Sequence, residues 1–189
     1  MSLIKVNELL QHATEHHYGV PAINVINTET IRYAIQAAED EHMPIIIQYW
    51  PGFEDHCALD IIAFAARYYA ERASVPVAVH QDHSAGYEIA VKGVKAGFPS
   101  VMVDGSSLPY EENFQLTKDV VQVAKIFDVD IEAELGHVGN GSDANDFVNS
   151  DHYTDPNLAE EFVEGTGCGS LAIAVGNAHG PYVKVPNLD

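Results

Sequence analysis

Six short apolar segments alternate with stretches of helical periodicity, and this alternation limits the possible folds more than any other feature of the chain. The apolar segments are residues 19–25, 44–48, 75–79, 100–104, 129–135 and 170–175. The first helical stretch begins at Thr28, which we predict as its N-cap. The others span residues 60–72, 86–96, about 109–127 and 155–165, and Pro156 has a favourable first-turn position in the last of them. Strand–helix units in series predict a parallel sheet with helices outside it and right-handed crossovers.

A polar side chain stands at or just after the end of every predicted strand: Asn24, Gln48, Asp82 with His83, Asp104, Glu134, and Asn177 with His179. Periodicity alone allows either a barrel or an open doubly wound sheet. A barrel focuses all strand ends on one central point, whereas an open sheet uses mainly its switch point, so we predict the barrel. A closed barrel of this type has eight strands. The expected fold is therefore a TIM-type (β/α)8 barrel with about six βα units in one domain, residues 1–189, that is C-terminally incomplete.

The third apolar segment ends in His80, Asp82 and His83, and this strand end is the first candidate for chemistry. Imidazole is a common zinc ligand, and a carboxylate beside a metal can act as a base. Together with His179 and the neighbouring carboxylates, this pattern predicts a shared metal site. Asp82 could serve there as a second ligand, as a group that orients a ligand, or as a base.

Charge and cysteine content narrow the partners and the compartment. The formal charge of −19 argues against a nucleic-acid partner and against docking to an anionic membrane. Cys57 and Cys168 are far apart and form no C-x-x-C motif, which excludes a cysteine zinc cluster; a lone disulfide is possible, but a reducing compartment fits better. The chain has no leader-type N-terminus and no apolar run near the ~20 residues of a membrane span, so we expect a cytoplasmic protein.

Eight segments in a fixed order carry a family resemblance: residues 24–27, 44–48, 80–83, 96–106, 108–113, 132–136, 154–156 and 176–180. They resemble the class II, zinc-dependent ketose-bisphosphate aldolases of the fructose- and tagatose-bisphosphate type. The resemblance covers essentially the whole chain. It implies a (β/α)8 barrel that catalyses reversible aldol cleavage of a phosphorylated ketose to dihydroxyacetone phosphate and an aldehyde. Such an enzyme is a lyase of carbohydrate metabolism that acts in glycolysis.

The resemblance also implies roles for the residues at the strand ends. His83 and His179 match zinc ligands, and Asp82 matches the acid/base that serves the hydroxyl at the cleaved bond. Asp104 and Glu134 match carboxylates near the metal that can hold an alternative or second divalent cation.

The remaining implications concern substrate and assembly. Asn24 and Gln48 match substrate-side polar residues, and Gly180 begins a loop that binds phosphate and a monovalent cation in the family. The expected partners are a small phosphorylated sugar and further copies of the chain, as a dimer or tetramer.

Several positions depart from the family pattern. Trp50 stands where a serine commonly helps to bind a substrate phosphate, Ser142 stands where a mobile-loop glutamate shuttles a proton, Ser107 replaces a frequent histidine, and Lys184 is displaced by one position. The chain also ends before the strands that carry the family's third zinc histidine. These departures leave open a weakened or inactive homologue that acts as an interaction or assembly subunit. A metal-dependent hydrolase on the same barrel lacks any supporting motif. Which ketose is bound, and whether it carries one phosphate or two, stays open.

Overall fold

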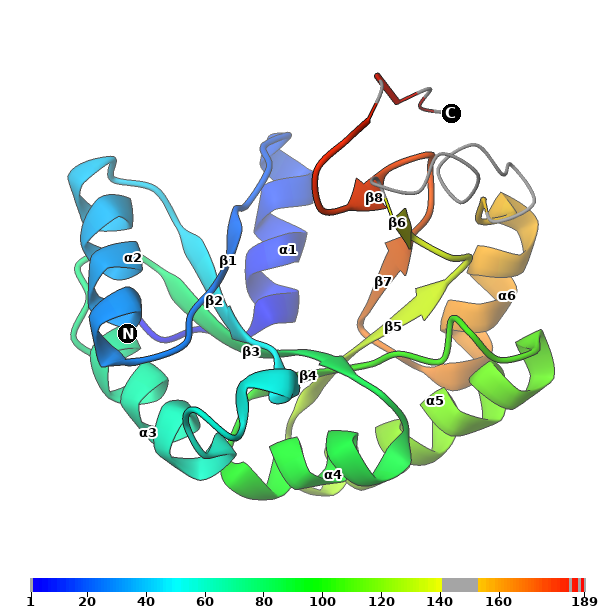
Figure 1. The fold of residues 1–189 in the computed structure, drawn as a ribbon, viewed down its shortest axis with the longest axis horizontal. Helices are drawn as coiled ribbons and strands as arrows, with labels where there is room; N and C mark the ends of the chain where they lie inside the picture. The colour runs from blue at the N-terminus through cyan, green and yellow to red at the C-terminus, as the bar shows by residue number, and fades with distance from the viewer. Residues whose placement is uncertain (1, 141–152, 184, 187, 189) are drawn as a thin grey trace.

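A parallel sheet curls into part of a barrel in the computed structural model of the protein, which describes residues 2–140, 153–183, 185–186 and 188 (Figure 1). Its strands are β1 (Ala22–Asn24), β2 (Ile45–Tyr49), β3 (Val77–Ser84), β4 (Ser100–Val103), β5 (Asp130–Leu135) and β7 (Ser170–Ile173), paired in that order. Each neighbouring pair is parallel. The predicted architecture, a TIM-type barrel of which about six βα units are present, is confirmed.

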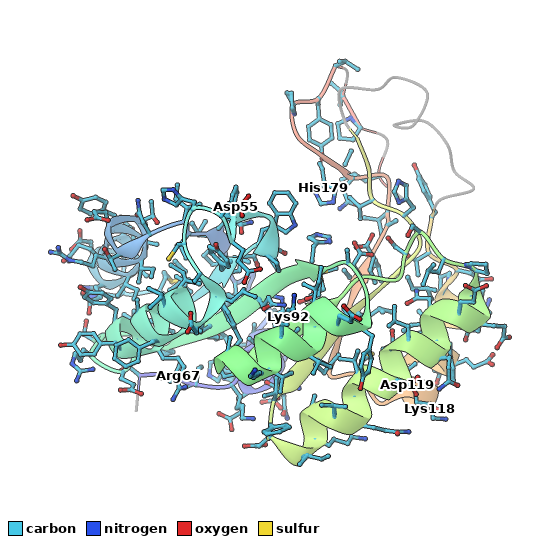
Figure 2. All side chains as sticks on the ribbon, turned by 60° about the horizontal axis from the view of Figure 1, so that its bottom comes forward. Asp55, Arg67, Lys92, Lys118, Asp119 and His179 are labelled. Carbon is cyan, nitrogen blue, oxygen red and sulfur yellow. The ribbon has the colours of Figure 1, made fainter. Side chains whose placement is uncertain are left out.

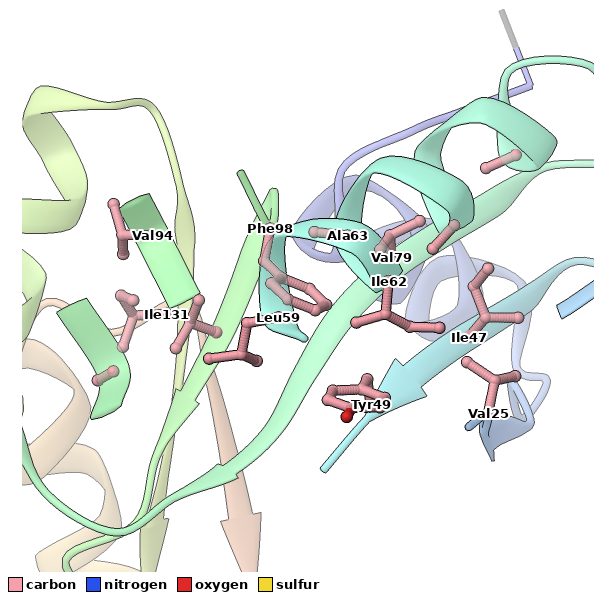
Figure 3. Close-up of a cluster of buried hydrophobic side chains, with 14 of the residues drawn as sticks. Val25, Ile47, Tyr49, Leu59, Ile62, Ala63, Val79, Val94, Phe98 and Ile131 are labelled. Carbon is pink, nitrogen blue, oxygen red and sulfur yellow. The ribbon is translucent and has the colours of Figure 1, made fainter. Parts of the chain in front are cut away.

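Helices cover the convex face of the sheet. They are α2 (Thr28–Asp40), α3 (Leu59–Ala70), α4 (Tyr87–Ala96), α5 (Tyr110–Ile126) and α6 (Pro156–Thr166), and Figure 1 shows them as an outer arc in chain order. The main core fills the space between the two layers. Figure 3 shows Ile47 and Val79 of the sheet with Ile62 of α3 and with Phe98, which follows α4; all of them are buried. Alternate strand residues supply this core, which leaves the other half facing the barrel interior.

A further helix, α1 (Val6–His16), lies on the concave side of the sheet, between β1 and β7 in Figure 1. Its Val6 and Leu9 form a second, smaller core with Ile46 and Ala78, whose side chains point away from the outer helices. This helix was not among those predicted from the sequence, although its buried residues have helical spacing. It closes the amino-terminal end of the barrel and leaves the carboxyl ends of the strands accessible.

Local signals set the helix starts, with one correction. Thr28 is not the N-cap of α2, because Asn27 has that role and Thr28 is already helical. The Asn27 side chain accepts a hydrogen bond from the backbone N–H of Thr30, while the Thr30 hydroxyl accepts one from the N–H of Asn27, which forms a capping box. The predicted first-turn position of Pro156 is confirmed, and Asp155 caps that helix.

The sheet stays open within the described residues, where β1 and β7 form its edges. Ile23 on β1 and Ile173 on β7 are 45% and 47% exposed. A two-stranded parallel sheet, β6 (Gly139–Asn140) with β8 (Ala178–His179), stands at the carboxyl end of the half-barrel. No helix in the described segments is long and apolar enough to cross a membrane.

Candidate active site

A β-bulge brings Asp82 and His83 into one cavity. On β3, Gln81 pairs with Val101 of β4 but Ser84 pairs with Val103, so two residues of β3 stand opposite one residue of β4. On a regular strand, adjacent side chains point to opposite faces. Here His83 has φ 27°, a strained value for a residue other than glycine, and both side chains line the same cavity.

The bulge is held from the outer side of the sheet by Gln81. Its Nε2 donates to the Ser84 hydroxyl at 2.7 Å and to the carbonyl of Ile89 in α4 at 3.2 Å. The side chain is fully buried, and it fits because residue 93 of α4 is glycine: a Cβ there would lie 2.1 Å from the Gln81 Oε1. One buried amide thus joins both ends of the bulge to the helix that follows.

Three potential ligands converge beside the bulge. A nitrogen of His83 and carboxylate oxygens of Asp104 and Glu134 all lie within 4.8 Å of one another. His83 Nδ1 is 2.9 Å from Asp104 Oδ2 and 3.8 Å from Glu134 Oε2. These side chains come from the carboxyl ends of β3, β4 and β5, which the parallel sheet places next to each other. An imidazole with two carboxylates suits zinc and other divalent cations, so the residues fit a metal.

The charges in this cluster shift one another's pKa values. The hydrogen bond to Asp104 raises the pKa of His83 to about 9, against the opposing effect of burial. Burial alone would raise the pKa of Asp104, but the hydrogen bonds from His83 and Ser106 outweigh it and lower that pKa to about 2. Burial, together with the charge of Asp104, raises the pKa of Glu134. Without a metal, His83 and Asp104 therefore form an ion pair at neutral pH, and a bound cation would have to displace the His83 proton.

Asp82 lies next to the cluster but is held separately. Its Oδ2 accepts a hydrogen bond from Asn24 Nδ2 at 3.0 Å, and its Oδ1 is 3.9 Å from His83 Nε2. Its exposed fraction is only 9%. Asn24, at the end of β1, thus orients a carboxylate whose second oxygen faces the centre of the site.

A second polar layer, whose role was not predicted from the sequence, lies deeper in the barrel. His80 Nδ1 is 2.8 Å from the Ser100 hydroxyl, and His80 Nε2 is 3.3 Å from Glu132 Oε2. Burial lowers the pKa of His80 to about 4 and raises the pKa of Glu132 to about 7. The available signal was the spacing of Glu132 and Glu134, because residues two apart on a strand share a face.

The cluster opens into a cavity of about 630 Å³ at the carboxyl end of the sheet. It is lined by Asn24, Gln48, Trp50, Phe53, Asp82, His83, Ala85, Asp104, Ser106, Glu134, His137, Val138 and His179. An adjoining cavity of about 360 Å³ shares Gln48, Asp82, His83, Glu134 and His179 and reaches Glu132. The volume suits a small-molecule ligand.

The structure therefore brings together all but one of the residues predicted for the site. Figure 2 shows His179 on the segment above the sheet, and its ring centroid is 5.3 Å from that of His83. His179 stands beside the three-ligand cluster rather than within it. Gly180, with φ 75°, does not line this cavity. Ser142 and Lys184 lie outside the described residues.

An open parallel barrel with imidazole and carboxylate groups at the carboxyl ends of its strands defines a TIM-type barrel protein with a candidate metal centre. The family model for class-II fructose-bisphosphate aldolase matches residues 4–189, and the chain belongs to that family.

Named relatives agree with this assignment. YdjI of Escherichia coli K12, described as uncharacterized, is 41% identical over 177 residues, which are 94% of this chain and 64% of YdjI. The crystal structure described as the YdjI aldolase superposes with a TM-score of 0.86 at 37% identity, over 99% of this chain and 66% of that one. Fructose-bisphosphate aldolase of Campylobacter jejuni has a TM-score of 0.80 at 27% identity, over 100% and 62%. The chain thus spans less than two thirds of the length of YdjI.

Proposed function

We propose that this protein catalyses metal-dependent, reversible aldol cleavage of a phosphorylated ketose to dihydroxyacetone phosphate and an aldehyde. The observation that carries the proposal is the bulge that places Asp82 and His83 side by side in the cavity, next to Asp104 and Glu134. A proton-transfer group beside a cation site is what aldol chemistry needs, and family membership gives the reaction class.

His83 and His179 would hold the metal, with Asp104 and Glu134 within reach as further ligands or as partners that orient the imidazoles. The family association and this set of donors support zinc. When bound, the metal supplies a Lewis acid for the ketose carbonyl and stabilises the negative charge that develops on the donor fragment.

Asp82 would carry the proton at the cleaved bond. In the cleavage direction, its carboxylate takes the proton of the hydroxyl on the carbon that becomes the aldehyde. The carbon–carbon bond breaks as the aldehyde C=O forms, and the bonding pair passes to the donor fragment, which takes up a proton from solvent to become dihydroxyacetone phosphate. In the reverse direction, protonated Asp82 returns the proton to the new alkoxide. The hydrogen bond from Asn24 keeps Oδ2 engaged, which leaves Oδ1 for this transfer.

The experiment is the condensation reaction in zinc-saturated protein. Dihydroxyacetone phosphate is supplied with a panel of phosphorylated and unphosphorylated aldehydes, and its consumption is followed with and without a chelator. We expect chelator-sensitive consumption with at least one aldehyde. Folded, zinc-loaded protein that consumes the donor with none of them would refute the proposal.

A further inference from the structure

An aromatic wall bounds the cavity on the side of β2. Trp50 precedes the 3-10 turn η1 (Pro51–Phe53) and Phe53 is its last residue; both line the cavity, with ring centroids 5.2 Å apart and ring planes at 90°. Trp50 is 44% exposed, so its indole presents substantial area to the cavity. Buried Tyr49 contacts Phe53 from below at a centroid distance of 6.1 Å. The Tyr49 hydroxyl also donates to the carbonyl of Cys57, which anchors the loop that follows.

The position of the indole depends on glycine at residue 52. A Cβ there would lie 2.4 Å from the Trp50 ring, so the indole packs directly over the Gly52 backbone. Any larger residue would push the indole away from this position. The wall is therefore built by the local sequence and is independent of any ligand.

The charges around this wall disfavour a phosphate. None of the described residues that line the cavity is lysine or arginine, whereas Asp82, Asp104 and Glu134 contribute carboxylates. His83 also lines the cavity, but its imidazole is already paired with Asp104. Figure 2 shows Arg67 and Lys92 on the helices of the outer layer. Phosphate recognition relies on arginine, lysine or several N–H donors, and Trp50 offers a single indole N–H.

We infer that the Trp50 end of the cavity holds the uncharged, hydroxylated end of the substrate, so that the aldehyde released by cleavage carries no terminal phosphate. The inference rests on the proposed function and names its substrate class: a ketose monophosphate whose single phosphate belongs to the dihydroxyacetone phosphate half. The flat indole face packs against the C–H groups of a polyol chain, while polar groups such as the Gln48 amide face its hydroxyls.

The first test compares two acceptors that differ only in the phosphate, D-glyceraldehyde and D-glyceraldehyde 3-phosphate, in condensation with dihydroxyacetone phosphate. We expect kcat/KM to favour the unphosphorylated aldehyde, and Trp50→Ser to shift the ratio by roughly tenfold or more toward the phosphorylated one, since one charge-assisted hydrogen bond has about that effect. Trp50→Phe should keep the wild-type preference. Ile126→Ser, at an exposed apolar position on α5 outside the cavity lining, is the matched control and should leave the ratio unchanged.

A second readout needs no turnover. Trp50 is the chain's one tryptophan, so the intrinsic emission reports on this wall alone. Titration with D-glyceraldehyde should change the emission at lower concentration than D-glyceraldehyde 3-phosphate or inorganic phosphate does, and Gly52→Ala should weaken the response to D-glyceraldehyde. If dihydroxyacetone phosphate is consumed with neither aldehyde, the proposed catalysis fails, and the emission titration alone then tests which compound binds at Trp50. A preference for the phosphorylated compound in either assay, or an unchanged ratio in Trp50→Ser, would overturn it.

Discussion

Replacing Gly93 by alanine probes the amide that holds the active-site bulge. The new Cβ would lie 2.1 Å from the Gln81 Oε1 and 2.6 Å from its Nε2, so the amide must leave its position. Its two hydrogen bonds, to Ser84 and to the Ile89 carbonyl, would be lost at roughly 1 kcal/mol each. Overpacking in a filled interior adds roughly 1–3 kcal/mol, and the better helix propensity of alanine returns about 1 kcal/mol. We expect Gly93→Ala to lower the free energy of unfolding by about 2–4 kcal/mol.

The assay is reversible urea denaturation of metal-free protein, with a double-mutant cycle as the control. In a Gln81→Ala background, the Cβ of residue 93 has room, so the same substitution should be neutral or stabilising by up to about 1 kcal/mol. Zinc affinity should fall in Gly93→Ala, because the released bulge no longer fixes His83. If Gly93→Ala is as stable as the wild type, or if it has equal effects in both backgrounds, then residue 93 need not be glycine to make room for the Gln81 amide and the explanation is refuted.

Three further predictions concern the site itself. His83→Ala and His179→Ala should each sharply reduce bound zinc, measured by metal analysis after dialysis, and unchanged zinc in both would show the ligand assignment to be wrong. Asp82→Asn should retain zinc while kcat falls by roughly 10²–10⁴-fold; near-normal kcat with full zinc would contradict the acid/base role. In metal-free protein, the stabilisation from His83, whose pKa rises from 6.5 to about 9, should be complete below pH 6.5 and lost as pH rises through 9. The stabilisation from Asp104, whose pKa falls from 3.8 to about 2, should be present above pH 3.8 and lost as pH falls through 2; Asp104→Asn should flatten the alkaline part of the stability curve, and an unchanged curve would exclude the ion pair.

Much of the architecture could be read from the chain. Strand and helix signals alternate in sequence, and short connections between them permit little besides a parallel sheet with outer helices. The carboxyl ends of parallel strands share one edge, so Asn24, Gln48, Asp104 and Glu134 could be placed together without coordinates. Periodicity could have located α1, whose buried residues have helical spacing, but not the face of the sheet that it covers.

Which chemical groups meet at the carboxyl end of the barrel can be read from the chain, because strand periodicity and the alternation of strands with helices are visible in each segment. How these groups meet depends on contacts between segments. The bulge at Asp82 and His83 depends on the register between two strands and on the fit of Gln81 against α4, which no single segment specifies. The contact between buried His80 and partly exposed Glu132 likewise joins residues from separate strands. The pKa values and the cavity wall depend on burial and on contacts between elements, which exist only in the folded chain.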